Sequence, residues 1–315
     1  MVATAQRPQV RPVIFRSFIP TPLLPLRPAV KHLVRYAGSL KTMTIAAGYM
    51  SSNGILLCAD TEHSDNIAKY KKTKVYQLKQ HLIVTGAGNS HLLKVAADRL
   101  FYAIPKAPAN EQAALASVDK VIYDLHRRNI YKNFSAESQN RPEVHLIVAV
   151  RCGDGKLTLI KTENDAASLG GSYVSVGTGA YLFEYWAHHL FDRQLDFEAA
   201  SYLLLFILRE VKLHVSGCGG DSQVLVLARD ENYWAGSEML RDDSLLAGFP
   251  ASVCQVLADC VDYPATNDQD LKKSTERFLG ALAELRDKMR AKHQVDLQRR
   301  QSTKGDPKFP QPSRE

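Results

Sequence analysis

The chain has 315 residues, of which 45% are hydrophobic, a proportion typical of a globular protein with a substantial core. Its net charge of +7 does not indicate a nucleic-acid-binding face. Seven of the 40 Lys and Arg residues lie in residues 1–42, which contain no Asp or Glu, and the rest of the chain carries 33 residues of each sign. No apolar run approaches the roughly 20 residues that cross a membrane. The composition therefore argues against nucleic-acid and membrane partners.

Five cysteines, an odd number, are scattered along the chain, and none belongs to a Cys-x-x-Cys pair. Some of them lie within apolar, strand-like segments. This pattern predicts buried free thiols in a reducing compartment, so we expect a cytoplasmic protein. No motif predicts a cofactor or a metal. The five are Cys58, Cys152, Cys218, Cys254 and Cys260.

Residues 1–43 form a basic leader with six of the 14 prolines and no clear periodicity. Three interpretations are open: an organelle-targeting segment, a propeptide that covers Thr44, or upstream sequence ahead of the true start at Met43. The third is favoured, because Met before a small residue such as Thr is readily removed, which would leave Thr44 at the terminus. We expect the leader to be absent from the mature protein.

Residues 44–50 and 55–60 read as two apolar strands joined by Ser-Ser-Asn-Gly at 51–54, which is strong turn chemistry. A hairpin brings its far ends together, so the Thr44 hydroxyl is expected beside the Asp60 carboxylate. Lys74 opens another strand-like run, 74–78. A Thr hydroxyl, a carboxylate and a lysine are the parts of an activated oxygen nucleophile, provided that Thr44 is the first residue.

Helices and strands follow in separate runs. The pattern predicts helices over about 90–104, 110–131, 180–190 and 196–214, with Asn110 and Asp196 as N-caps and the last helix buried between layers. Residues 62–72 read as a polar loop. The two glycines of Gly86 to Ser90 leave a strand and enter a helix, which suits a tight turn and close backbone approach. Segregated runs of this kind indicate an α+β domain with helices packed outside sheets. Further strands are expected at 81–85, 144–152, 157–161, 172–177, 222–228 and 233–235.

Beyond about residue 240 the character changes, and we expect a C-terminal helical extension over 241–298. Four apolar residues repeat there at spacings of 4, 3 and 4, which is a narrow seam suited to one partner helix, either on the same domain or on another subunit. Residues 299–315 are polar and contain Pro, which predicts disorder. The seam residues are Phe278, Leu282, Leu285 and Met289.

Several motifs together resemble the proteasome β-subunit family of N-terminal-nucleophile (Ntn) hydrolases. These are Thr-Ile-Ala-Ala-Gly at 44–48, the turn glycine at 54, Ile-Leu-Leu-Cys-Ala-Asp-Thr at 55–61, Lys-Val at 74–75 and Gly-Ala-Gly at 86–88. Ser-Val-Gly-Thr-Gly at 175–179 resembles the family's Gly-Ser-Gly turn. The resemblance covers roughly 44–230 and implies a four-layer αββα sandwich over 44–240.

The resemblance also implies roles for individual residues. Thr44 would be the nucleophile, with its own α-amino group as general base, directly or through a water. Lys74 would lower the pKa of the Thr44 hydroxyl, and Asp60 would orient Lys74. The backbone N–H of Gly88 would stabilise the oxyanion, and Thr178 would take the place of a supporting Ser.

The chain departs from the family at two points. The stretch 214–221, His-Val-Ser-Gly-Cys-Gly-Gly-Asp, offers Ser216 and Asp221 as supports for the amine, but neither matches cleanly, and Ser216 is taken as the candidate. Met43 stands where self-processing subunits usually have Gly. That favours simple Met removal, as in the related bacterial ATP-dependent protease.

The family implies a threonine-type endopeptidase that acts on peptides or unfolded proteins within a homo-oligomeric ring, and it leaves room for a regulatory ATPase. Two alternatives stay open. One is a non-proteasomal Ntn amidase on the same fold. The other is a catalytically silent structural subunit, which would follow if residues 1–43 are retained and Thr44 lacks a free amine.

Overall fold

The computed structural model describes residues 44–64, 69–135, 137–138, 141–191, 195–229, 232–234, 256 and 268–303. The chain divides into units 1–40 and 41–315, and only the second contains described residues. The predicted leader, 1–43, therefore lies outside the described residues. The described part of the second unit contains two five-stranded antiparallel sheets, a two-stranded sheet and helices, which is an α+β fold as the sequence predicts.

The first sheet contains the predicted hairpin, β1 (Ala46–Met50) and β2 (Gly54–Asp60), between β10 (Tyr173–Val176) and β11 (Ser222–Ala228). β12 (Asn232–Trp234) forms its far edge. The 51–54 turn is closed by Ser51, whose hydroxyl donates to the carbonyl of Gly54 over 2.7 Å. Every residue of β2 is buried because both faces of this central strand are covered.

The second sheet has the order β5 (Val75–Lys79), β6 (Leu82–Gly88), β7 (Val144–Arg151), β8 (Leu157–Glu163) and β9 (Ala166–Leu169). β6 continues through Gly86 and Gly88, which the sequence analysis assigned to a turn. Both glycines pair with β7 instead, where a Cβ on Gly86 would clash with the carbonyl of His145 and one on Gly88 with that of Glu143. The close backbone approach expected of these glycines is confirmed, whereas the tight turn is wrong, because both glycines lie within β6.

Three short strands were missed. Residues 62–72, predicted as a polar loop, contain β3 (Glu62–Ser64) and β4 (Lys69–Lys71), which pair with each other. β9 is a four-residue edge strand on β8. All three are too short to show a two-residue hydrophobic period, so pairing with neighbouring backbone decides their conformation.

Helices α1 (Ser90–Ala103) and α2 (Glu111–Leu125) follow the prediction, and Asn110 caps α2 by accepting a hydrogen bond from the Ala113 N–H over 3.0 Å. The last part of the predicted helix, to residue 131, is the π-helix η2 (His126–Tyr131). Asn89, which the sequence analysis did not single out, caps α1 with two hydrogen bonds to the first turn.

Helices α3 (Ala180–Leu190) and α4 (Phe197–His214) also lie where the sequence predicts them, and Asp196 caps α4. The middle of α4, 204–208, is buried on every side, as expected from its apolar composition. It packs against the first sheet and against α3, where Trp186 meets Phe206 edge to face at 5.5 Å.

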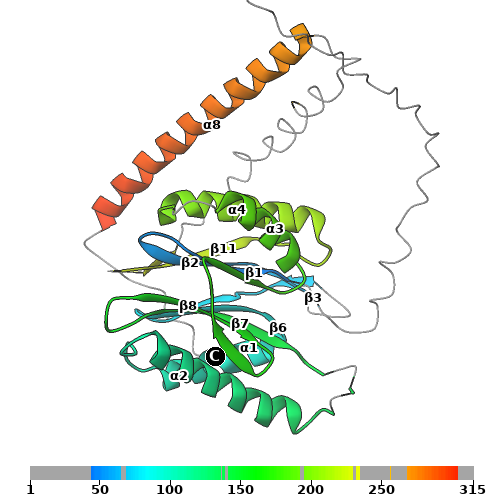
Figure 1. Cartoon of the computed structure of the whole chain (residues 1–315), viewed down its shortest axis with the longest axis vertical. Coiled ribbons are helices and arrows are strands. Elements are labelled where there is room, and N and C mark those ends of the chain that lie inside the picture. The colour runs from blue at the N-terminus through cyan, green and yellow to red at the C-terminus, as the bar shows by residue number, and fades with distance from the viewer. Residues whose placement is uncertain are drawn as a thin grey trace, which may run out of the picture. The chain divides into compact units, whose positions relative to one another are not determined.

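Helices α3 and α4 lie on one side of the two sheets and α1 and α2 on the other (Figure 1). Three hydrophobic clusters hold these elements together. One joins α3 and α4 to the first sheet, a second joins α1 and α2 to the second sheet, and a third lies between the two sheets. β2 shows the alternation behind this arrangement, since Leu56 and Cys58 face α4 whereas Ile55, Leu57 and Ala59 face the other sheet. Burial of each large aliphatic side chain contributes about 1.5–3 kcal/mol.

α8 (Asp268–Thr303) is the helix of the predicted C-terminal extension. It includes 299–303, which the sequence analysis assigned to a disordered tail; the first helix-breaking residues there are Gly305 and Pro307, which come later. Three residues of the predicted seam, Phe278, Leu282 and Leu285, are half-buried. The side chain of Met289 and residues 304–315 lie outside the described part of the chain.

Candidate functional site

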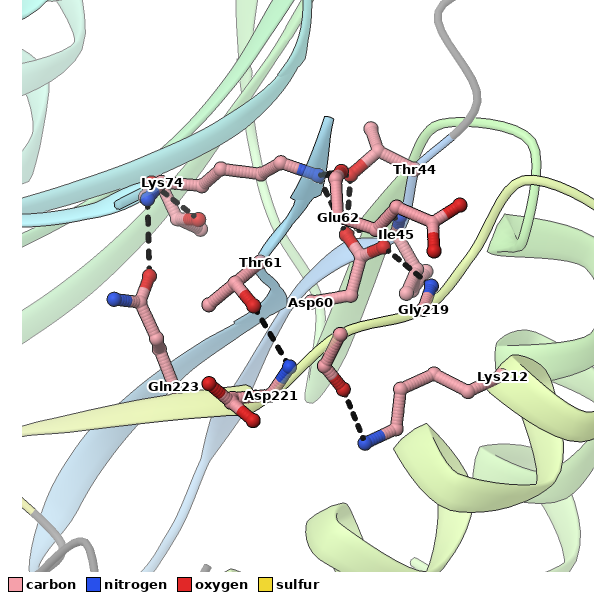
Figure 2. A network of polar contacts seen from close by, with 12 residues as sticks. Thr44, Ile45, Asp60, Thr61, Glu62, Lys74, Lys212, Gly219, Asp221 and Gln223 are labelled. Atoms are coloured by element: carbon pink, nitrogen blue, oxygen red, sulfur yellow. Dashed lines mark hydrogen bonds and ion pairs between the residues drawn. The ribbon is translucent and has the colours of Figure 1, made fainter. Parts of the chain in front are cut away.

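Thr44, Asp60 and Lys74 meet in one buried polar cluster (Figure 2). The Thr44 hydroxyl donates to Asp60 Oδ1, and Lys74 Nζ donates to the Thr44 hydroxyl. Lys74 Nζ also donates to Asp60 Oδ1 over 2.8 Å. Asp60 is fully buried, and Thr44 and Lys74 are only 3% and 5% exposed, so the cluster is shielded from water. The three residues singled out in the sequence are therefore brought together.

Each sheet contributes to this cluster. Thr44 precedes β1 and Asp60 ends β2, and the register of the hairpin places Ala46 opposite Ala59. Lys74 comes from the other sheet, immediately before β5. Its backbone is fixed on both sides, because its N–H donates to Gln223 over 2.9 Å and its carbonyl accepts from the Thr85 hydroxyl over 3.0 Å. The Lys74 side chain thus extends to Thr44 and Asp60 from a backbone position that is fixed immediately before β5.

The carboxylate of Asp60 is compensated on both oxygens. Oδ1 accepts from Thr44, Lys74 and the backbone N–H of Ile45, and Oδ2 accepts from the backbone N–H of Gly219 over 2.9 Å. Removal of such a charge from water is costly unless it is paired and hydrogen-bonded. Four donors thus satisfy both oxygens of the buried carboxylate.

Lys74 uses all of its hydrogen-bonding capacity. An ammonium group has three N–H donors, and those of Lys74 reach Thr44 Oγ1, Asp60 Oδ1 and the backbone carbonyl of Glu62. A neutral amine could not satisfy these three acceptors. The arrangement therefore favours a charged lysine that polarises the Thr44 hydroxyl, rather than one that takes its proton.

The loop between α4 and β11 closes one side of the cluster. Asp221 exchanges two hydrogen bonds with Thr61, through its backbone N–H to the Thr61 hydroxyl over 2.7 Å and through its carbonyl to the Thr61 N–H over 2.8 Å. The Asp221 side chain is directed outward to Lys71, 2.9 Å away, where both side chains are 67% exposed. Asp221 thus fixes the loop through its backbone, and its carboxylate lies away from Thr44.

Ser216, the residue taken from this loop as a candidate, is exposed on a turn, and no hydrogen bond of the described residues joins it to the cluster. Cys218 is buried instead, and the half-buried Gly219 donates its backbone N–H to Asp60 Oδ2. Burial raises the pKa of the Cys218 thiol to about 12, helped by the charge of Asp60. The sequence analysis missed both residues, because the hydrophobic periodicity of the flanking elements does not define the register of a glycine-rich loop.

The turn at 177–179 holds the other side of Thr44. Gly179 N–H donates to the Thr44 carbonyl over 3.2 Å. Gly177 has a φ of +98°, and a Cβ there would clash with the same carbonyl. Thr178 lies between these two glycines and is half-buried. The predicted position of Thr178 next to Thr44 thus agrees with the packing of this turn.

Gly88, the predicted oxyanion donor, lines a pocket together with Thr44 and Lys74. Its φ of +118° lies in a region that residues other than glycine rarely adopt. Any other residue at this position beside Thr44 would therefore strain the backbone. Gly88 and the Thr44 hydroxyl thus border the same pocket.

A family model described as "Proteasome subunit" matches residues 41–227. The chain belongs to the proteasome subunit family. The match covers both sheets up to Leu227, and it excludes α8. Comparison with curated protein sequences found no match.

Within the proteasome-subunit region, five of the six predicted site residues lie around a single point. Thr44, Asp60 and Lys74 form the hydrogen-bonded cluster, Gly88 lines the adjoining pocket and Thr178 lies in the turn that binds the Thr44 carbonyl. Ser216 is the exception. Three buried free thiols, at positions 58, 152 and 218, agree with the cysteine prediction, whereas Cys254 and Cys260 lie outside the described residues.

The described helices include none that is both long and apolar enough to cross a bilayer.

Proposed function

We propose that this proteasome-family protein is a threonine-type endopeptidase in which Thr44, once it is the first residue, attacks the peptide bond. The observation that supports this most strongly is the hydrogen bond from the Lys74 ammonium to the Thr44 hydroxyl, inside a cluster closed by Asp60. A threonine buried for its strand propensity alone has no need of a buried ammonium donating to its oxygen.

Lys74 acts by charge. A cation within hydrogen-bonding distance favours the ionised form of an oxygen, so it lowers the pKa of the Thr44 hydroxyl. Asp60 orients Lys74 and keeps it protonated. Because all three N–H groups of Lys74 already have acceptors, the proton of the Thr44 hydroxyl needs a different base. The α-amino group of Thr44, with an ordinary pKa of about 7.7–8.0, supplies one at neutral pH.

In the acylation step, Thr44 Oγ1 forms a bond to the carbonyl carbon of the scissile peptide, and its proton passes to the α-amino group, directly or through a water. The backbone N–H of Gly88 stabilises the negative charge that develops on the carbonyl oxygen. The carbon–nitrogen bond of the peptide then breaks, and the proton moves from the α-amino group to the leaving amine. The product is an ester between the substrate and Thr44.

Deacylation reverses the roles. A water gives a proton to the α-amino group and its oxygen attacks the ester carbon, the bond from that carbon to Thr44 Oγ1 breaks, and the proton returns to Thr44. Thr178 supports the α-amino group from the 177–179 turn, whereas Ser216, being exposed, has no part in the proposed site. The reaction consumes one water and needs no cofactor.

The same proposal extends to the architecture. The two sheets with helices on their outer faces support a four-layer αββα sandwich of the Ntn-hydrolase type, with the domain over 44–240 and a helical extension after it. The subunits would form a homo-oligomeric ring in the cytoplasm around unfolded-protein or peptide substrates, with a regulatory ATPase as a further partner. The buried free thiols agree with a reducing compartment.

Hydrolysis of peptide amides tests the proposal. The full-length sequence is expressed, the N-terminus of the purified protein is determined by intact mass, and a panel of peptide–aminocoumarin substrates is assayed. Thr44→Ala is expected to remove activity, whereas Thr44→Ser keeps a nucleophilic hydroxyl and retains part of it. Equal rates in wild type and Thr44→Ala would contradict the assignment.

Two outcomes would favour the alternatives. Cleavage of small amides together with no cleavage of any peptide would indicate a non-proteasomal amidase. A protein that retains residues 1–43 and hydrolyses nothing would be a catalytically silent structural subunit, because Thr44 would then have no free amine.

A further inference from the structure

The pocket beside Thr44 is lined by side chains of one electrostatic sign. Two lysines, a histidine and several neutral residues surround it, and none of the described residues that line it is an Asp or Glu. The nucleophile itself lies in the lining, so whatever occupies the pocket is adjacent to the reacting bond. The lining residues are Thr44, His63, Lys72, Thr73, Lys74, Tyr76, Gly86, Ala87, Gly88, Ser90 and Leu93.

Both the backbone and the ammonium group of Lys72 form hydrogen bonds in the wall of this pocket. Its backbone N–H donates to the carbonyl of Thr61 over 2.9 Å, and Thr61 follows Asp60 directly. Its Nζ donates to the hydroxyl of Ser90, at the start of α1, over 3.2 Å. The side chain is half-buried, so the ammonium bridges two walls of the pocket.

The neighbouring lysine has a different environment. Lys71 is directed outward, where it forms an ion pair with Asp221 at 2.9 Å. The ion pairs of the described residues do not include Lys72, and its Nζ donates to the neutral hydroxyl of Ser90. A half-buried ammonium with a neutral partner can still bind an anion, and Lys72 differs in this respect from a solvated surface lysine.

The nearby carboxylates are directed away from Lys72. Asp60 is engaged by Lys74 and by the N–H of Gly219, and the Glu62 carboxylate lies against Gly219, where a Cβ would clash with it. Figure 2 shows the Glu62 side chain extending from the backbone carbonyl that binds Lys74 toward Gly219. The positive charge of the pocket is therefore not compensated from within by these groups.

We propose that this pocket binds an acidic side chain, Asp or Glu, of the substrate residue that donates the acyl group to Thr44, and that Lys72 is the specificity-determining residue. This rests on the proposed function, because it is the attack by Thr44 that places the preceding side chain in the pocket. Lys72 pairs with the substrate carboxylate, and Ser90 donates its hydroxyl proton to the same group. A neutral amide of equal size cannot replace the ion pair.

The test compares isosteric substrates. Full-length protein, with its N-terminus determined by intact mass, is assayed with acetyl-tripeptide-aminocoumarins ending in Asp, Asn, Glu, Gln, Leu or Arg. The kcat/KM for Asp is expected to exceed that for Asn by about 10- to 100-fold, the range of a charge-assisted hydrogen bond in a partly buried site. Preference for Leu or Arg over both acids would overturn the inference.

Variants assign the preference to one side chain. Lys72→Gln is expected to reduce the Asp/Asn ratio toward one, and Lys72→Arg to keep most of it because the charge remains. Lys120→Gln is the matched control: it removes the same charge from an exposed position on α2, which packs on the outer face of the second sheet. An unchanged ratio in Lys72→Gln would exclude this role of Lys72.

A binding measurement separates this inference from the catalytic proposal. Acetyl-Ala-Ala-Asp and acetyl-Ala-Ala-Asn are titrated into the same protein and into Lys72→Gln by calorimetry. The Asp peptide is expected to bind more tightly than the Asn peptide, and Lys72→Gln to remove this difference. If this result is obtained with a protein that hydrolyses no peptide, it would support acidic recognition by the pocket and contradict the proposed peptidase activity. Equal binding of the two peptides would overturn the pocket, whatever the enzyme cleaves.

Discussion

At the scale of single residues, the site depends on a buried charge pair that neither partner could maintain alone. Asp60 and Lys74 are both buried, and each provides much of the compensation for the other. A buried pair contributes little net stability compared with apolar residues, but loss of one partner leaves an uncompensated charge. The pair is thus better explained by its contact with the Thr44 hydroxyl than by stability.

A variant of Lys74 measures the stability cost of leaving the buried Asp60 charge without its partner. Lys74→Met is expected to lower the free energy of unfolding by about 3–5 kcal/mol, because Asp60 then remains buried without its cation. The double variant Asp60→Asn/Lys74→Met should recover much of that loss and still hydrolyse nothing. Urea denaturation and a peptidase assay provide the two readouts. Full activity in Lys74→Met would exclude the proposed role of the lysine.

His126 provides a pH test at the same scale. Burial lowers the pKa of this histidine below its usual 6.5. The charge of Asp165 opposes this shift, as does a backbone hydrogen bond to Val144, whereas the charges of Arg141 and His145 act in the same direction as burial. The unfolded chain therefore binds a proton first as the pH falls, so the stability contributed by neutral His126 is present above about pH 6.5 and lost below it. His126→Phe should flatten the fall in stability between about pH 6.5 and 5.

Unfolding midpoints in urea at several pH values would check this, with His188→Phe as the control. His188 is exposed on α3, so its removal should leave the pH dependence as it is in the wild type. A slope that is the same in wild type and His126→Phe would show that other groups cause the acid sensitivity.

At the scale of elements, the turn between β10 and α3 matters because it contacts the backbone of Thr44, the proposed nucleophile. Gly177→Ala combines two costs: a positive φ that L-residues rarely adopt and a clash with the Thr44 carbonyl. We expect a loss of more than about 1–3 kcal/mol of stability, the usual cost of such a conformation alone, together with a large loss of activity as Thr44 is displaced.

Gly155→Ala is the matched control for that variant. Gly155 also has a positive φ, +78°, but no atom lies within 4 Å of a Cβ placed there. Gly155→Ala should therefore lower the free energy of unfolding by only about 1–3 kcal/mol and leave the peptidase activity unchanged. Thermal unfolding and the peptidase assay would distinguish the two variants. Equal activity in both would show that the turn does not position Thr44.

The elements also show what the sequence can predict. The 44–60 hairpin and helices α1 to α4 were predicted, because long periodic segments and their caps carry strong local signals. β3, β4 and β9 were missed, since segments of three or four residues become strands only when a partner backbone is present. For Gly86 and Gly88 the close backbone approach was predicted but the turn was wrong, because glycine in a turn and glycine at a close strand contact look the same in a sequence.

The residues of the site also fall into those that could be predicted from the sequence and those that could not. Thr44, Asp60 and Lys74 were predicted from strand ends and a family resemblance, and they meet in the structure. The contribution of Gly219 and the contrast between Lys71 and Lys72 were not predictable, because both depend on how a loop and a short hairpin lie relative to the two sheets.

At the scale of the whole molecule, the proposed ring makes a prediction about mass. Each chain has a mass of 35.0 kDa, or less after removal of the leader. Light scattering behind size-exclusion chromatography should give a particle of several subunits at micromolar concentration, because ring assembly is proposed to enclose the Thr44 sites. A monomer with full peptidase activity would contradict the ring.

In the proposed mechanism, the Thr44 site works only when the bond between Met43 and Thr44 is absent. Intact-mass analysis of material that is active on peptides, combined with labelling of the N-terminal amine, tests this requirement. We expect Thr44 to be the first residue of the active species, and blocking of its amine to abolish hydrolysis. Active protein that still begins at Met1, with Thr44 inside an intact peptide bond, would contradict it.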